Sequence, residues 1–173
     1  MSRYDSPSAK EHQAAAPESV ACAVLTVSDT RTLADDRSGN TIVELLASAG
    51  HRVADRVLVR DEPVEVAAAV QALAANESVD AILVTGGTGI ASRDQTPEAL
   101  AGLFTKELPG FGELFRMLSY QQIGAAAMLS RAVGGVVGQT VVLLMPGSTP
   151  AVRLAMEQLI LPEIGHLVEH ARR

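Results

Sequence analysis

A glycine-rich segment is the part of this sequence with the clearest chemical meaning. The residues Thr85, Gly86, Gly87, Thr88 and Gly89 directly follow an apolar run. Three glycines in four positions let backbone N–H groups approach an anion and surround it. The segment lacks the G-x-G-x-x-G spacing of dinucleotide-binding folds and the Lys-Ser/Thr pair of a P-loop. Taken alone, it fits a tight turn between strand and helix as well as it fits a phosphate-binding loop.

Two aspartates strengthen the phosphate-binding interpretation. Asp61 follows the apolar run 53–59, and Asp94 follows the glycines. In open α/β sheets, ligands bind beyond the carboxyl ends of the strands, and paired carboxylates there hold Mg²⁺ that bridges to phosphates. Each aspartate also precedes a proline that suits a first helical turn, so helix capping is the alternative for either residue alone. Together with the glycine loop, the pair predicts catalytic, magnesium-binding acids.

Other polar residues are expected at the same edge of the sheet. Ser28 and Asp29 follow the first apolar run, and Pro146, Gly147 and Ser148 follow the last one. We expect both groups to bind substrate. The free N–H groups of the helix that starts near Ser148 would receive a second phosphate or a ribose, and Ser28 and Asp29 add polar side chains at the same edge. Turn formation and capping explain the second group equally well. The polar loop that begins at Ser28 is a candidate lid.

The order of the apolar runs indicates the fold class. Short, nearly continuous apolar runs alternate with segments of helical periodicity, in the order 20–27, 42–49, 53–59, 63–73, 81–85 and 96–104. This rhythm predicts right-handed crossovers and an α/β fold, with a mainly parallel, doubly wound sheet that carries helices on both faces. Thr96 is expected to cap the last of these helices.

The C-terminal half is expected to add an antiparallel hairpin and further helices. The β-rich runs 132–137 and 140–145 are separated by a Gly-Gln pair, which is typical of a hairpin. A helix that starts after Ser148 is expected to break at Pro162, before a last short helix. The apolar residues within 115–118 have helical spacing and are expected to form an ordinary core face.

Length and composition narrow the class of protein. A chain of 173 residues, 47% hydrophobic and 20% charged, suits one globular domain, which we place at 20–173. Residues 1–19 have no periodic apolar face and are expected to form a mobile tail. The net charge of −6 argues against nucleic acid as a partner, and the lack of a long apolar run predicts a cytoplasmic protein without a membrane partner. Cys22 is expected to be a small buried residue.

Four segments carry a family resemblance. They are TGGTGIASRDQTPEAL, PGFGELFRMLS, MLSRAVGG and LLMPGSTPAVR, and VSDTR and DDRSGN near the start agree with them. In this order and spacing they resemble the MoaB/MogA family of molybdenum cofactor biosynthesis. The resemblance covers about 20–169, and the stretch FRMLSYQQIG looks closer to the MoaB branch.

The resemblance implies a molybdopterin adenylyltransferase that uses Mg²⁺ and ATP to attach AMP to molybdopterin, with release of pyrophosphate. Asp61 and Asp94 match the family's catalytic, magnesium-associated acids, Gly86–Gly89 match its phosphate loop, and Ser130 matches a pterin-side position. A trimer or a dimer of trimers is implied, and the small residues 124–127 agree with close subunit packing. A molybdopterin molybdotransferase is a further expected partner.

Two alternatives stay open at this point. Some MoaB members lack the transferase activity. The main alternative is therefore a catalytically silent molybdopterin-binding or scaffold protein of the same fold. An unrelated nucleotide-binding module would depend on the glycine loops alone.

Overall fold

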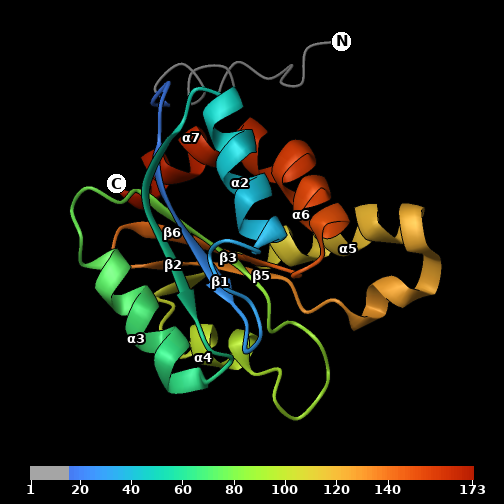
Figure 1. Ribbon diagram of the computed structural model, residues 1–173. Helices are drawn as coiled ribbons and strands as arrows, with labels where there is room; N and C mark the ends of the chain where they lie inside the picture. Colours follow the sequence, from blue (N-terminus) through green and yellow to red (C-terminus); the bar gives the residue numbers. More distant parts are fainter. Residues whose placement is uncertain (1–15) are drawn as a thin grey trace.

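Six strands form one mixed sheet, in the order β2-β1-β3-β6-β5-β4 (Figure 1). The structure is a computed structural model and describes residues 16–173. The strands are β1 (Ala21–Val27), β2 (Arg52–Val59), β3 (Ala81–Thr85), β4 (Lys106–Glu107), β5 (Val133–Val137) and β6 (Thr140–Met145). The first four in the sheet order pair in parallel, whereas β5 pairs antiparallel with both β6 and β4. The expected α/β fold and its added hairpin are confirmed.

Helices cover both faces of the sheet and enclose two hydrophobic cores. On one face lie α2 (Arg37–Ser48), α5 (Pro109–Ile123), α6 (Thr149–Ala155) and α7 (Leu161–Ala171), and on the other lie α3 (Pro63–Ala74) and α4 (Thr96–Ala101). The 3₁₀ helix η1 (Gly124–Leu129) extends α5, and the π-helical turn η2 (Met156–Ile160) joins α6 to α7. Within residues 16–173, no helix is both long and apolar enough to cross a bilayer.

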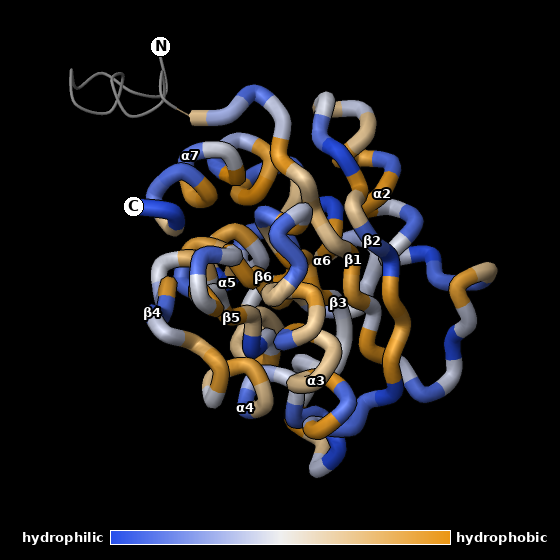
Figure 2. Tube along the Cα trace, turned by 90° about the vertical axis from the view of Figure 1, so that its left-hand side faces the viewer, coloured by the Kyte–Doolittle hydropathy of each residue, from blue (hydrophilic) through white to orange (hydrophobic). Residues whose placement is uncertain are grey.

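The central strands are apolar throughout because both of their faces are covered. Every residue of β1, β3 and β6 is buried. Successive residues of a strand point to opposite faces, so Val24 packs in the core beneath α2 while Leu25 packs in the core beneath α3. Figure 2 shows hydrophobic stretches along these strands and hydrophilic segments in the outer loops.

Two helix starts differ from the sequence-based expectation. Helix α2 begins at Arg37, inside the segment expected to be a loop, because the Asp36 carboxylate accepts a hydrogen bond from the Gly39 N–H group (3.0 Å) and caps the helix. Thr96 does not cap α4. The N-cap residue is Gln95, and Thr96 is buried within the first turn.

The expectations for Pro162 and for the core face of α5 were wrong in part. Pro162 does not break the chain of helices, because the wider turn of η2 leads directly into α7 and accommodates a residue without an N–H group. In α5, Phe115 is buried as expected, but Met117 is 53% exposed. The apolar face of this helix therefore extends onto the molecular surface.

The tail expected at 1–19 lies mostly outside the described residues. Within its last part, the Ser19 hydroxyl donates to the Gly50 carbonyl (2.8 Å). The backbone of Pro17 also runs close to α7, since a Cβ on Gly165 would lie 2.8 Å from the Pro17 carbonyl oxygen. Contacts with the folded part of the chain therefore begin before residue 20.

Candidate functional site

A polar cleft of about 440 Å³ lies where the carboxyl ends of β1, β3 and β6 meet. This is the edge of a parallel sheet at which α/β proteins bind ligands. The cleft is lined by residues that immediately follow each of these strands. The sequence-predicted residues among them are Ser28, Gly86, Gly87, Thr88, Gly89, Asp94, Gly147 and Ser148. The glycine loop and the segment after β6 thus belong to one site.

The first two glycines of the loop cannot be replaced without strain. Gly86 has φ of +112°, and a Cβ there would lie 2.2 Å from the backbone oxygen of Val27. Gly87 has φ of +63°, and its Cβ would lie 2.0 Å from Thr96 Oγ1 and 3.0 Å from Asp61 Oδ1. These positions favour glycine because the loop passes against β1 and against the side chains behind it.

Arg131 fixes the orientation of the glycine loop, and sequence reasoning did not single it out. Its Nε donates to the carbonyl oxygens of Gly89 (2.8 Å) and Thr88 (3.4 Å), and Nη2 donates to that of Asp94. Its Nη1 pairs with Glu98. A trans peptide is planar with opposed C=O and N–H bonds, so the Gly89 N–H group points away from Arg131. The arginine therefore orients amide groups that an anion could use.

Neither predicted acid caps a helix, so the capping alternative for both is rejected. The N-cap of α3 is Glu62 and that of α4 is Gln95. The Asp94 carboxylate instead accepts a hydrogen bond from the Ala91 N–H group (2.9 Å), which closes the loop after the glycines. Asp61 lies beneath that loop, and its Oδ1 is 3.5 Å from Thr96 Oγ1.

The electrostatics of Asp61 are unfavourable for its charge. Burial raises the pKa of Asp61 above its ordinary value, and the neighbouring charges of Asp94 and Asp29 raise it further. Asp29 is close because its Oδ1 accepts a hydrogen bond from the Asp61 N–H group (3.2 Å). A carboxyl group whose pKa is raised by burial and by neighbouring carboxylates is typical of functional sites, and a bound cation would offset both effects.

A second basic residue, Arg93, links the loops around these acids. Its Nη2 lies 2.9 Å from Asp29 Oδ2 and 3.2 Å from Glu62 Oε1. The three residues come from the loops that follow β3, β1 and β2. Arg93 therefore connects loops that are separate in sequence, and it reduces the repulsion between the carboxylates at this edge.

The loop after β1 is anchored by a buried carboxylate, which limits its use as a lid. Asp36 is fully buried, and it accepts hydrogen bonds from Thr26 Oγ1 (2.6 Å), Ser38 Oγ (3.0 Å) and the Gly39 N–H group (3.0 Å). Burial alone would raise the pKa of Asp36, but these hydrogen bonds outweigh it and hold the pKa below its ordinary value. The charged form of Asp36 is thus part of the fold.

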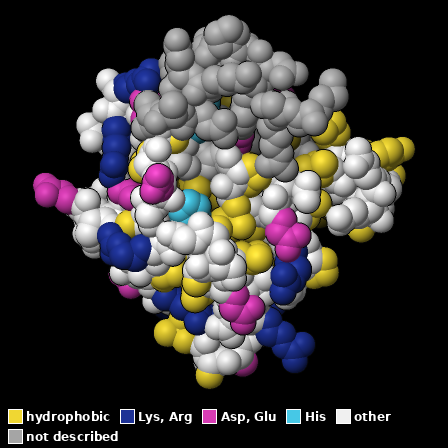
Figure 3. All heavy atoms as spheres, turned by 90° about the horizontal axis from the view of Figure 1, so that it is seen from above, with side chains coloured by type: hydrophobic (Ala, Val, Ile, Leu, Met, Phe, Trp, Pro, Cys, Tyr) yellow, Lys and Arg dark blue, Asp and Glu magenta, His cyan; other side chains and the backbone are white. Residues whose placement is uncertain are grey.

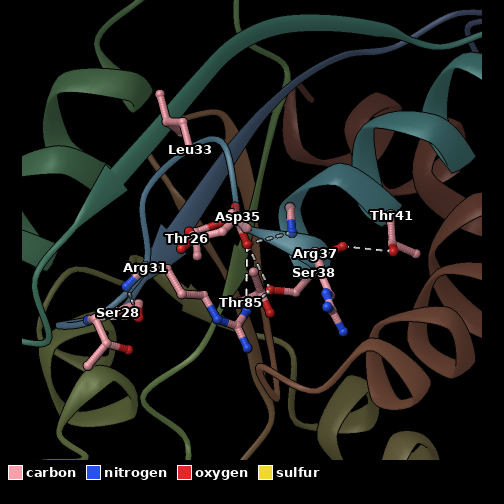
Figure 4. Close-up of polar contacts among 12 residues, drawn as sticks. Thr26, Ser28, Arg31, Leu33, Asp35, Arg37, Ser38, Thr41 and Thr85 are labelled. Atoms are coloured by element: carbon pink, nitrogen blue, oxygen red, sulfur yellow. Dashed lines mark hydrogen bonds and ion pairs between the residues drawn. The ribbon is translucent and has the colours of Figure 1, made fainter.

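Asp36 also faces two guanidinium groups. Arg31 Nη1 lies 3.6 Å from Asp36 Oδ1, and Arg56 Nη2 lies 3.3 Å from Asp36 Oδ2. Figure 4 shows Arg31 extending from the loop after β1 toward Ser38, to whose Oγ it donates (2.6 Å). Arg31 lines the cleft, whereas Arg56 belongs to the edge strand β2 and does not.

Ser148 lines the cleft, and Pro146 precedes the lining residue Gly147 in the segment after β6. Asp29 and Asp61 belong to the neighbouring loops and are not among the lining residues. The Pro146 carbonyl accepts a hydrogen bond from Thr85 Oγ1 (3.1 Å), which holds the segment after β6 against the glycine loop. Ser148 is the N-cap of α6, but its hydroxyl makes no capping hydrogen bond within the described residues. Ser130 precedes Arg131 and is not part of the cleft lining, and its buried hydroxyl finds no partner among residues 16–173.

Comparison with known proteins identifies the family. Residues 23–166 match the family model described as a probable molybdopterin binding domain. Molybdenum cofactor biosynthesis protein B of Bacillus cereus is 52% identical over 167 residues, which cover 96% of this chain and 99% of that protein. The protein of the same name from Escherichia coli is 46% identical over 142 residues, 82% of this chain and 84% of that protein. The chain belongs to the MoaB/MogA family.

Solved structures of MoaB/MogA members share the fold. A crystal structure of molybdenum cofactor biosynthesis protein B has a TM-score of 0.89 at 52% identity, covering 91% of this chain and 99% of that one. MoaB of Pyrococcus furiosus, a tungsten cofactor synthesizing protein, has a TM-score of 0.81 at 38% sequence identity, and the match covers 91% of this chain and 100% of that one. The Mog protein of Mycobacterium ulcerans has a TM-score of 0.79 at 28% sequence identity, and the match covers 88% of this chain and 99% of that one. This MoaB/MogA chain accordingly functions in molybdenum cofactor biosynthesis, as its sequence predicts.

Proposed function

We propose that this MoaB/MogA protein adenylylates molybdopterin with Mg-ATP and releases pyrophosphate. The observation that supports it best is a pair of half-buried acids on the glycine loop: Asp94 lines the cleft, and Asp61 lies behind Gly87, where a Cβ would be 3.0 Å from its Oδ1. In the reaction, the terminal phosphate of molybdopterin attacks the α-phosphorus of ATP, and the bond from that phosphorus to the pyrophosphate oxygen breaks. Catalysis then consists of positioning two anions in line and neutralising their charge.

The residues present fit a magnesium ion that is shared with substrate. Mg²⁺ takes one or two carboxylates together with phosphate oxygens and waters, and it would offset the burial and the neighbouring charges of Asp94 and Asp29 that raise the pKa of Asp61. Asp61 and Asp94 would hold the ion, which supplies charge neutralisation at the phosphates. The Gly89 N–H group and the Ser148 hydroxyl would donate hydrogen bonds to phosphate oxygens, and no protein nucleophile is required.

The proposal is tested by incubating the full chain with molybdopterin, ATP and MgCl₂. Pyrophosphate release and adenylylated pterin are followed together, and a parallel reaction contains EDTA in place of the metal. We expect both products only with Mg²⁺. Binding of molybdopterin without either product would select the catalytically silent alternative.

We also propose that the protein is a trimer or a dimer of trimers, assembled through the surface of α5 and η1. This segment projects from the sheet, and Figure 3 shows hydrophobic side chains on the side toward which it extends. The exposed apolar residues here, between 47% and 79% accessible, are Leu114, Met117, Tyr120, Ile123, Met128 and Leu129. Apolar patches of this kind mark interfaces.

Light scattering on the purified chain measures the assembly. The variant Met117→Glu/Ile123→Glu should lower the molar mass to that of a monomer, because it places charges within the apolar surface. Val64→Glu is the matched control, since Val64 is 81% exposed on α3, away from that surface. A monomeric wild-type chain at micromolar concentration would refute the assembly but not the chemistry.

A further inference from the structure

The cleft contains one basic side chain. Among the described residues that line it, Arg31 is the only Lys or Arg, and the others include Asp94 and several hydroxyl groups. A phosphoryl ligand would carry negative charge into a cleft that already holds a carboxylate. Backbone N–H groups supply only partial positive charge, so a full cation in the lining has a large effect on the affinity of an anion.

The guanidinium of Arg31 is held in place by one of its nitrogens. Nη1 donates to Ser38 Oγ (2.6 Å) and lies 3.6 Å from Asp36 Oδ1. Among residues 16–173, no hydrogen bond engages its Nε or Nη2. The side chain is 38% exposed. Arg31 is therefore oriented before a ligand arrives and keeps donors for one, which reduces the entropy lost on binding.

The local charge balance leaves Arg31 available to an anion. One buried carboxylate, Asp36, faces the guanidinium groups of both Arg31 and Arg56, so the three side chains together carry a net positive charge. The exposed Asp35 carboxylate is a further acid close to Arg31. It accepts hydrogen bonds from the Thr32 N–H group (2.6 Å) and hydroxyl (3.0 Å), and its attraction for Arg31 is screened by solvent.

We propose that Arg31 binds a phosphoryl group of the substrate in this cleft, with Asp36 and Ser38 as the residues that position it. The proposal rests on the proposed function of the same cleft and identifies the side chain that recognises its anionic ligand. The shared chemistry is a phosphate ester or anhydride, which both ATP and molybdopterin provide. Bidentate donation from a planar guanidinium matches two phosphate oxygens.

Titration calorimetry on the full chain distinguishes ATP from molybdopterin as the source of the phosphoryl group. ATP and molybdopterin are titrated individually into the wild type, Arg31→Gln, Arg31→Lys and Arg56→Gln, and the melting temperature of each variant is recorded. Arg56→Gln is the matched control, because it also removes a partner of Asp36 but does not alter the cleft lining. Arg31→Gln should weaken one of the ligands roughly tenfold to hundredfold, and Arg31→Lys should restore part of that loss.

The ligand that loses affinity identifies which substrate supplies the phosphoryl group. Wild-type affinity of Arg31→Gln for both ligands would overturn the proposal. So would equal losses in Arg31→Gln and Arg56→Gln, because that result assigns the effect to the fold around Asp36. These are binding measurements, so an absence of adenylyl transfer by the wild type would refute the proposed enzyme activity and leave the role of Arg31 standing.

Discussion

Replacing Asp61 or Asp94 with Asn tests the chemistry of the site while preserving its local contacts. An Asn side chain retains an oxygen that accepts a hydrogen bond, so the contacts from Thr96 to Asp61 and from Ala91 to Asp94 can persist. Burial and neighbouring charges raise the pKa of Asp61, so the folded protein disfavours its charged form at neutral pH. Asp61→Asn removes that cost and should leave the melting temperature unchanged or higher.

The expected effect on turnover is large. Under the proposed function, each carboxylate helps to neutralise charge as the α-phosphorus is attacked, so its loss should slow adenylyl transfer on the order of 10²-fold or more. This corresponds to about 3 kcal/mol of additional barrier. A residue that only shapes the loop would show the opposite pattern, with lower stability and nearly unchanged turnover.

Single-turnover adenylyl transfer at several Mg²⁺ concentrations is the appropriate assay, with thermal unfolding recorded in parallel. We expect folded, inactive variants that still bind molybdopterin, which would place both acids on the side of the metal and ATP. Rates close to wild type in both variants would refute the catalytic assignment. A melting temperature lowered by many degrees would instead assign the residue a structural role.

Four further outcomes are expected. In a carboxyl NMR titration, Asp94→Asn should lower the pKa of Asp61, because Asp94 contributes to its rise, and an unchanged titration would disprove that coupling. In urea unfolding, Gly86→Ala should cost about 1–3 kcal/mol or more, whereas Gly50→Ala, also at positive φ but with open space around it, should cost less. Arg131→Gln should raise the KM for ATP because the loop loses its carbonyl contacts, and an unchanged KM would contradict the orienting role. Burial raises the pKa of Cys22 to about 12, so this thiol should resist alkylation at pH 8 until the protein is unfolded, and rapid labelling of the native state would contradict its burial.

The central strands were predictable because burial on both faces leaves a local signature, whereas the short, exposed strand β4 has none and was missed. The run 81–85 is strand β3 with the same limits, since all of its residues are buried and residues 81–84 alternate between the two cores. The start of α2 was not predictable in the same way. Its capping residue, Asp36, depends on contacts with Thr26 and Arg56, which lie 10 and 20 residues away in the sequence.

The same distinction holds for the residues of the candidate site: those that follow a strand were predictable, and those defined by contacts distant in sequence were not. The glycines follow β3 directly, Asp61 comes soon after β2, and Asp94 follows in the loop after the glycines, so their place at this edge of the sheet can be inferred from the sequence. Arg131 could not be found in this way, because its loop partner Gly89 is 42 residues distant. Arg93 was likewise missed, since its contact with Glu62 spans 31 residues and exists only once three loops are brought together.

The order of the strands links ligand binding to folding of the whole chain. β3 lies between β1 and β6 in the sheet, although β1 is near the beginning of the described chain and β6 is near its end. A ligand in the cleft touches the ends of all three, so no fragment that lacks one of them can form its complete contacts. Its binding free energy therefore adds to the stability of the entire sheet. Saturating ligand should therefore slow those proteolytic cuts that require the sheet to open, whether they fall near β1 or near β6.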